Sequence, residues 1–224
     1  MAVHHQVERD IEAFARYWGL RKESFLEWTF EIYEGIVKPV AREGAWMEPL
    51  ILELNNMAFT EWILFECEMR EGRTPLQLYI DNPPEGVGEE ALERLRDVER
   101  TQFFSRFAIL DKDLERGVAA LRDVRTDLRY DVIDPHLCEK PEWGCGTIAQ
   151  RIAKVGDEWA VVGQMCLYDR APAATTAVDG PGEFHPEDAD LRPELREAGF
   201  FLRLMHDVLG VDGRYRRSLK AVSS

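Results

Sequence analysis

Residues 104–168 decide the fold class of this chain, and they read FSRFAILDKDLERGVAALRDVRTDLRYDVIDPHLCEKPEWGCGTIAQRIAKVGDEWAVVGQMCLY. Apolar and polar residues alternate with a period of two at several places, which is typical of half-buried β-strands. We expect five short strands, at residues 106–110, 118–124, 128–132, 147–155 and 158–165. Such a series predicts a small five-stranded antiparallel barrel of the SH3 or OB kind, because closure protects the strand edges.

The last two expected strands are separated by Gly156-Asp157, which predicts a two-residue hairpin. Glycine reaches positive φ without a Cβ clash, and tight hairpin turns need such a residue. The polar connection from Asp111 to Gly117 predicts another turn.

The chain before this module has helical periodicity. Apolar residues recur at helical spacing in residues 6–18, 22–42, 49–70 and 89–102. The third stretch is apolar over much of its circumference, so we expect it at the centre of a helical bundle. Pro39 is expected to kink or end the second helix. Thr74 followed by Pro75 predicts the capped start of a further short helix.

The predicted fold class is therefore α+β, with an N-terminal helical bundle, a barrel and a C-terminal helix. We expect a helical domain at 1–103, the β-barrel module at 104–168, a linker at 169–190 and a C-terminal helix and tail at 191–224. The final helix, expected at 193–209, must bury its apolar face on the barrel, on the helical base or on another subunit.

Composition narrows the class of protein. An apolar content of 45% excludes wholesale disorder. The sequence has no run of about 18 apolar residues and no signal-peptide layout, so we expect a cytoplasmic protein that does not enter a membrane. The four cysteines have irregular spacing, which favours reduced thiols over a disulfide framework.

The net charge of −14 lies mainly in the helical part. Residues 1–104 carry 21 acidic and 11 basic side chains, whereas 105–168 carry 11 and 9. Such acidity repels phosphate backbones and disfavours nucleic-acid binding. The basic cluster of Arg214, Arg216, Arg217 and Lys220 is interpreted as a solvated tail.

The loop before the fourth expected strand holds His136, Cys138 and Cys145, which are residue types that bind Zn²⁺. Their spacing is not that of a recognised zinc finger, and a further ligand such as His185 is needed. Cysteine is also a common small buried residue, and the glycines beside Cys145 fit a turn into a strand. We therefore expect no cofactor, and zinc is the one alternative that these residues leave open.

Catalytic signals are sparse. Glu61, Glu66 and Glu68 with Asp81 are a candidate carboxylate cluster for a divalent cation or acid–base chemistry, and a solvated acidic face is the alternative. Cys67 is expected to pack within its apolar helix. The chain has no nucleophile-elbow motif and no glycine pattern for phosphate.

Four aromatic residues fall within the barrel module and are the candidate binding residues. They are Phe107, Tyr130, Trp143 and Trp159. Small barrels recognise peptides or single strands through exposed rings, while packing in the core is the alternative interpretation. Trp143, in a loop beside Pro141, is the expected exposed ring.

A series of short motifs runs through residues 50–165. They are Trp62-x-Leu64-Phe65, Gly72-x-Thr74-x-Leu76-x-x-Tyr79, Asn82-Pro83 and Gly156-Asp157-x-Trp159 with Gly163. In this order they resemble a set of poorly characterised bacterial proteins, some of which carry a C-terminal SEC-C metal-binding motif. This chain lacks the Cys-x-Cys of that motif, so the resemblance implies the architecture and no metal or catalytic residue.

Three functions remain open. The first is a non-catalytic protein-binding or assembly module, which engages a protein partner or self-associates. The second is a metal-binding protein or metal-dependent hydrolase that uses His136, Cys138 and Cys145. The third is single-stranded nucleic-acid binding by the barrel, which needs a basic groove.

Overall fold

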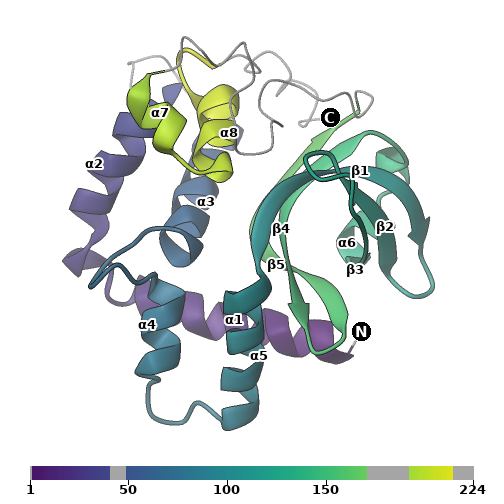
Figure 1. The fold of residues 1–224 in the computed structure, drawn as a ribbon, viewed down its shortest axis with the longest axis horizontal. Coiled ribbons are helices and arrows are strands. Elements are labelled where there is room, and N and C mark those ends of the chain that lie inside the picture. Colours follow the sequence, from purple (N-terminus) through teal and green to yellow (C-terminus); the bar gives the residue numbers. More distant parts are fainter. Residues whose placement is uncertain (1, 41–48, 171–191, 214–224) are drawn as a thin grey trace.

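The structure is a computed structural model that describes residues 2–40, 49–170 and 192–213. Helices gather on one side of the molecule and a β-sheet lies on the other (Figure 1). The chain is therefore of mixed α+β class, as the sequence predicts.

The N-terminal helices are longer or shorter than expected by a few residues. They are α1 (Ala2–Gly19), the 3₁₀ helix η1 (Lys22–Ser24), α2 (Leu26–Val37), α3 (Pro49–Phe65), α4 (Pro75–Asp81) and α5 (Glu89–Thr101). Helix α2 ends before Pro39, with Lys38 in the left-handed conformation. Most of α3 is buried, including every residue from Glu61 to Phe65, which confirms its predicted central place.

The predicted start of α4 is confirmed in detail. The Thr74 hydroxyl accepts a hydrogen bond from the backbone N–H of Gln77 at 3.4 Å, and the Gln77 side-chain oxygen accepts from the backbone N–H of Thr74 at 3.0 Å. Pro75 occupies the first helical position, where no donor is needed. This reciprocal capping box satisfies two N–H groups that would otherwise lack partners.

The sheet has five strands and closes on itself as a barrel, in the order β1-β2-β3-β5-β4. They are β1 (Phe103–Asp113), β2 (Val118–Asp123), β3 (Arg129–Ile133), β4 (Thr147–Val155) and β5 (Glu158–Asp169). Every pair is antiparallel except β3 and β5, which are parallel. The expectation of a wholly antiparallel sheet is therefore wrong, because a closed ring with an odd number of strands must contain a parallel pair.

The predicted hairpin is confirmed. Val155 pairs with Glu158 across the turn, and Gly156 has a φ of 61°. The bounds of β4 are those predicted, while β1 and β5 extend beyond them. Leu128, expected in a strand beside Tyr130, lies before β3 and is exposed.

The barrel has its own apolar core, made of inward-facing residues from all five strands and of the short helix α6 (Pro135–Cys138). Leu137 and Cys138 of α6 are buried in this core. The Lys112 ammonium, at the end of β1, donates to the carbonyl oxygen of Leu137 at 3.2 Å. These contacts place α6 over one end of the barrel.

The expected C-terminal helix is two helices, α7 (Pro193–Glu197) and α8 (Phe200–Leu209). Ala198 and Gly199 between them have extended backbone conformations, which break the helical hydrogen-bond series. Helix α8 is buried along its length and packs on α2, α3 and β1. The helix thus covers both the helical base and the barrel of its own chain.

Several sequence predictions fall outside the described residues. They are most of the linker at 169–190, His185 and the basic cluster at 214–220. The four cysteines lie within the described part, and none forms a disulfide there. Each helix of the described residues is too short or too polar to cross a bilayer.

Candidate functional site

Helices cover only part of the barrel. Helix α5 packs on β4, helices α1 and α3 pack on β5, and α8 packs on β1. Strands β2 and β3 have no comparable packing against these helices among the described residues. Figure 1 shows β2 at the edge of the molecule farthest from α2. Among the described residues, the outer side of β2 and β3, with the adjacent end of β1, is thus covered by none of these four helices, and we call it the uncovered face of the barrel.

A bulge in β1 determines which side chains reach this face. Ile109 pairs with Leu121 and points into the core, while Asp111 pairs with Ala120, so Leu110 is the extra residue between them. Because one residue is added, the alternation of sides is reversed beyond Leu110, and Asp111 lies outside. Ala120 also pairs with Asp131 of β3. The small Ala120 side chain is therefore flanked by carboxylates on both neighbouring strands.

These side chains line a hollow of about 180 Å³, which we call the acidic hollow. Its lining residues are Asp111, Asp113, Arg116, Val118, Ala120, Arg129 and Asp131. Arg129 contacts the Asp131 carboxylate at 3.1 Å, but both side chains are exposed and such surface pairs contribute little. Three exposed leucines lie nearby in the chain, at positions 110, 114 and 128. The hollow itself combines three carboxylates with two apolar lining residues, Val118 and Ala120.

The predicted aromatic residues do not form one surface. Phe107 is fully buried, so its ring contacts only the core of the folded barrel. Tyr130 and Trp159 lie together, edge to face at 4.9 Å between ring centroids. Trp143 stacks on Tyr168 near the end of β5, whereas Trp159 lies at the start of that strand. The Phe107 ring also lies edge to face with Tyr130, at 6.1 Å between centroids. The structure thus brings three of the four rings together in the barrel core and separates Trp143 from them, and Trp143 is half-buried instead of being the exposed ring expected.

The predicted zinc residues differ in exposure. His136 is exposed and lies edge to face with Trp143, while Cys138 is buried and Cys145 is exposed. Within the described ranges, no three His, Cys, Asp or Glu side chains are grouped to hold a metal. His185 lies outside those ranges. Zinc binding stays a prediction.

Buried thiols lack the properties of a nucleophile. Burial raises the pKa of Cys67 to about 11 and the pKa of Cys166 to about 12. Burial, with the nearby Asp134 carboxylate, also raises the pKa of Cys138. These three thiols therefore stay protonated near neutral pH, and the thiolate is the reactive form.

Three members of the predicted carboxylate cluster are divided between two ion-pair systems, and the fourth, Glu68, is exposed. Glu61 and Glu66 both contact Arg151, at 2.9 Å and 2.6 Å. Asp81 pairs with Arg73 at 2.7 Å. Glu61 and Glu66 are thus held by a cation of the chain itself, which explains their position without a metal ion.

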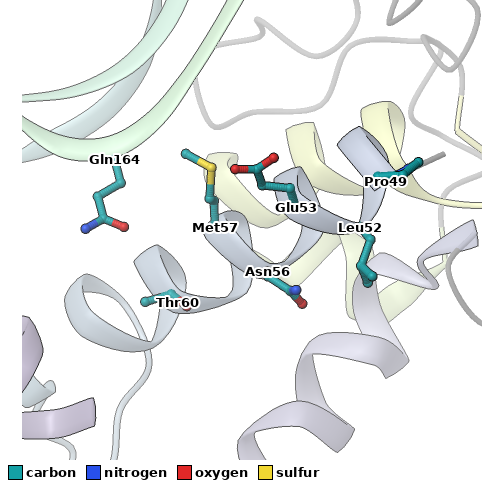
Figure 2. A pocket seen from close by; sticks show the side chains of 7 residues that line it. All are labelled: Pro49, Leu52, Glu53, Asn56, Met57, Thr60 and Gln164. Atoms are coloured by element: carbon teal, nitrogen blue, oxygen red, sulfur yellow. The ribbon is translucent and has the colours of Figure 1, made fainter. Parts of the chain in front are cut away.

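A second hollow, of about 350 Å³, lies along α3. Figure 2 shows its side chains along one exposed side of α3, with Gln164 of β5 beside them. Its wall at Pro49 adjoins residues 41–48, which lie outside the described part. Among its described lining residues, Glu53 alone carries a charge.

The sequence contains one signal for the acidic hollow. Alternation in β3 places Arg129 and Asp131 on the side opposite Tyr130, as predicted. Asp111 was expected in a loop, because the bulge at Leu110 interrupts the alternation that would have identified its strand.

Comparison of the chain with protein-family models, with curated proteins and with solved structures found no match.

Proposed function

We propose that this chain is a non-catalytic binding protein whose uncovered barrel face recognises a basic segment of a protein partner. The observation that supports this most directly is the acidic hollow over Ala120, which lies on strands that α1, α3, α5 and α8 do not cover within the described ranges. An apolar hollow floor with carboxylates at its sides favours a long cationic side chain, whose stem contacts the floor and whose charge meets the carboxylates.

We assign the barrel to the OB type on three features. The strand order is β1-β2-β3-β5-β4, the β3–β5 pair is parallel, and α6 lies between β3 and β4 at one end. OB barrels bind their ligands over strands 2 and 3 and the adjoining loops. The acidic hollow occupies the corresponding face, which supports a binding role by analogy of fold.

The mode of binding follows from the closed sheet. Each strand pairs with two neighbours, although only Val132 and Ile133 of β3 pair with β5, so the barrel offers little free edge to which a partner strand could be added. The partner must therefore contact side chains on the outer face. We infer a segment with a lysine or arginine between apolar residues, because the nearby Leu110, Leu114 and Leu128 are exposed.

Charge supports a basic partner over a nucleic acid. The chain carries a net charge of −14, which steers cationic partners toward it and repels phosphate. Three aspartates line the acidic hollow against two arginines. A single-stranded nucleic acid would therefore meet excess negative charge on the very face that OB barrels use.

Chemical-shift mapping of the ¹⁵N-labelled protein tests this function. The probes are two capped pentapeptides, Ala-Leu-Lys-Leu-Ala and the matched Ala-Leu-Glu-Leu-Ala, and an oligothymidine. We expect the lysine peptide to shift the amide signals of Asp111, Ala120 and Asp131, and the other probes to leave them unchanged. Shifts caused by oligothymidine alone, or lysine-peptide shifts confined to the helices, would contradict the proposal.

A further inference from the structure

A third hollow, of about 520 Å³, lies in the helical region, where the end of α1 meets η1, the start of α2, α4 and the segment after α3. We call it the aromatic pocket. Its walls include four aromatic residues and two arginines, which are Tyr17, Trp18, Phe25, Trp28, Arg21 and Arg70. Its volume lies within the range of about 300–1,000 Å³ that is typical of small-molecule sites.

Three of the four rings of this pocket, those of Tyr17, Trp18 and Phe25, are held by contacts within the chain. The indole N–H of Trp18 donates to the carbonyl oxygen of Pro75 at 3.1 Å. The Trp18 ring lies edge to face with Tyr17 at 5.5 Å and with Phe25 at 5.8 Å between centroids. A wall of fixed rings offers flat apolar surface at a low entropic cost of binding.

One guanidinium is also fixed in place. Arg21 donates from Nη1 to the carbonyl oxygen of Tyr17 at 2.9 Å, and its Cζ lies 3.7 Å from the centroid of the Tyr17 ring. Across the part of the chain that the structure describes, no carboxylate lies within ion-pair distance of Arg21 or Arg70. Arg73, close by in sequence, is instead paired with Glu71 and Asp81. Both pocket arginines therefore keep donors for an anion.

The charge of the pocket is opposite to that of its surroundings. Residues 1–104 carry a net charge of −10. None of the described lining residues of the aromatic pocket is acidic, whereas two are arginines. A positive site within an acidic region selects an anionic ligand, because cations are attracted to the surrounding surface instead.

We propose that the aromatic pocket binds a small flat aromatic anion, either a carboxylate or a phosphate ester. The rings take the flat body of the ligand, and the arginines take its anionic group through charge-assisted hydrogen bonds. This site is separate from the acidic hollow and is independent of the function proposed above.

Titration with 2-naphthoate and 1-naphthyl phosphate tests the proposal, with neutral 2-naphthylmethanol as the reference probe. The readout is the indole N–H NMR signals of Trp18 and Trp28, assigned from W18F and W28F. We expect at least one of the two anions to shift both signals and to bind about tenfold more tightly than the neutral probe. Which anion binds more tightly distinguishes a carboxylate site from a phosphate site.

The double variant R21Q/R70Q isolates the role of the arginines, and R9Q/R16Q, which changes two exposed arginines of α1, is the matched charge control. We expect the first to weaken anion binding about tenfold and the second to leave it unchanged. If R21Q/R70Q does not fold, R70Q alone serves, because Arg70 is exposed. Equal weakening in both double variants, or no shift of either indole signal by any probe, would overturn the proposal.

Discussion

The Nε of Arg151 in β4 donates to Oε1 of Glu61 in α3 at 2.9 Å, and each side chain is only 1% exposed. Oε2 of Glu61 accepts two more hydrogen bonds, from the backbone N–H groups of Gln164 and Met165 at 2.8 Å and 2.7 Å. One buried carboxylate thus joins the central helix to two strands. This pair therefore fixes β4 and β5 of the barrel against α3.

The first prediction concerns this pair. R151M should lower the free energy of unfolding by about 3–5 kcal/mol, because it leaves the Glu61 carboxylate buried without its cation. The control R96M breaks the exposed pair between Arg96 and Glu89 and should cost about 0–1 kcal/mol. Urea denaturation of the three proteins measures both values, and similar losses in the two variants would contradict the role assigned to Arg151.

The free energy of unfolding of R151M should also depend on pH differently from that of the wild-type protein. Burial raises the pKa of Glu61 above its usual 4.5, and Arg151 opposes that rise. Without Arg151 the pKa of the folded state rises further, so the folded protein binds a proton more tightly than the unfolded chain does. The stability of R151M relative to wild type should therefore fall as pH rises from 4.5 toward 8. If the difference in free energy of unfolding between R151M and wild type is the same at every pH, the raised pKa of Glu61 is contradicted.

Gly163 of β5 lies against the same pair. A Cβ at this position would lie 2.7 Å from both carboxylate oxygens of Glu61 and 2.8 Å from the Cβ of Arg151. We expect G163A to lower the free energy of unfolding by about 1–3 kcal/mol. G35A, where a Cβ on α2 meets nothing within 4 Å, should instead raise it by about 0.5–1 kcal/mol. Thermal unfolding distinguishes the two, and a stabilised G163A would show that the contact is not tight.

We expect the protein to lose stability in mild acid because His206 of α8 is buried. Burial lowers the pKa of His206 below its usual 6.5, an effect to which Arg192 adds and which Val37, Asp207 and Asp212 oppose. The unfolded chain therefore binds the proton more tightly, and the free energy of unfolding should fall as pH decreases below 6.5.

Urea denaturation from pH 7.5 to pH 5.5 measures this dependence. H206Q should have a flatter profile than wild type, and H5Q, which replaces an exposed histidine, should retain the wild-type profile. Identical slopes in wild type and H206Q would show that His206 does not titrate in this way.

Local features of the fold could be predicted because the residues that determine each of them lie within one short segment. The hairpin at Gly156 depends on a positive φ, and the start of α4 depends on Thr74 and Pro75 at consecutive positions. Alternation likewise identified most of the strands, and the apolar circumference of α3 indicated a central helix. In each case the deciding residues lie within a few positions of one another.

Features that depend on distant residues could not be predicted. The sequence leaves open whether Glu61 belongs to a carboxylate cluster or to a solvated acidic face, and it indicates neither burial nor the partner Arg151, which lies 90 positions away. The parallel β3–β5 pair follows from closure of the ring and not from either strand alone. No residue type near Leu110 indicates the bulge in β1. The bulge nevertheless places Asp111 on the side of the acidic hollow.

The central claim is that the carboxylates of the acidic hollow, and not the overall negative charge, recognise a basic segment. The most direct test compares D111N/D131N with D157N/E85Q, which changes two exposed carboxylates elsewhere by the same total charge. Binding of the lysine pentapeptide is measured at two salt concentrations. We predict that D111N/D131N binds about tenfold more weakly while D157N/E85Q binds as wild type does. Equal weakening in both variants, or unchanged binding by D111N/D131N, would contradict the claim.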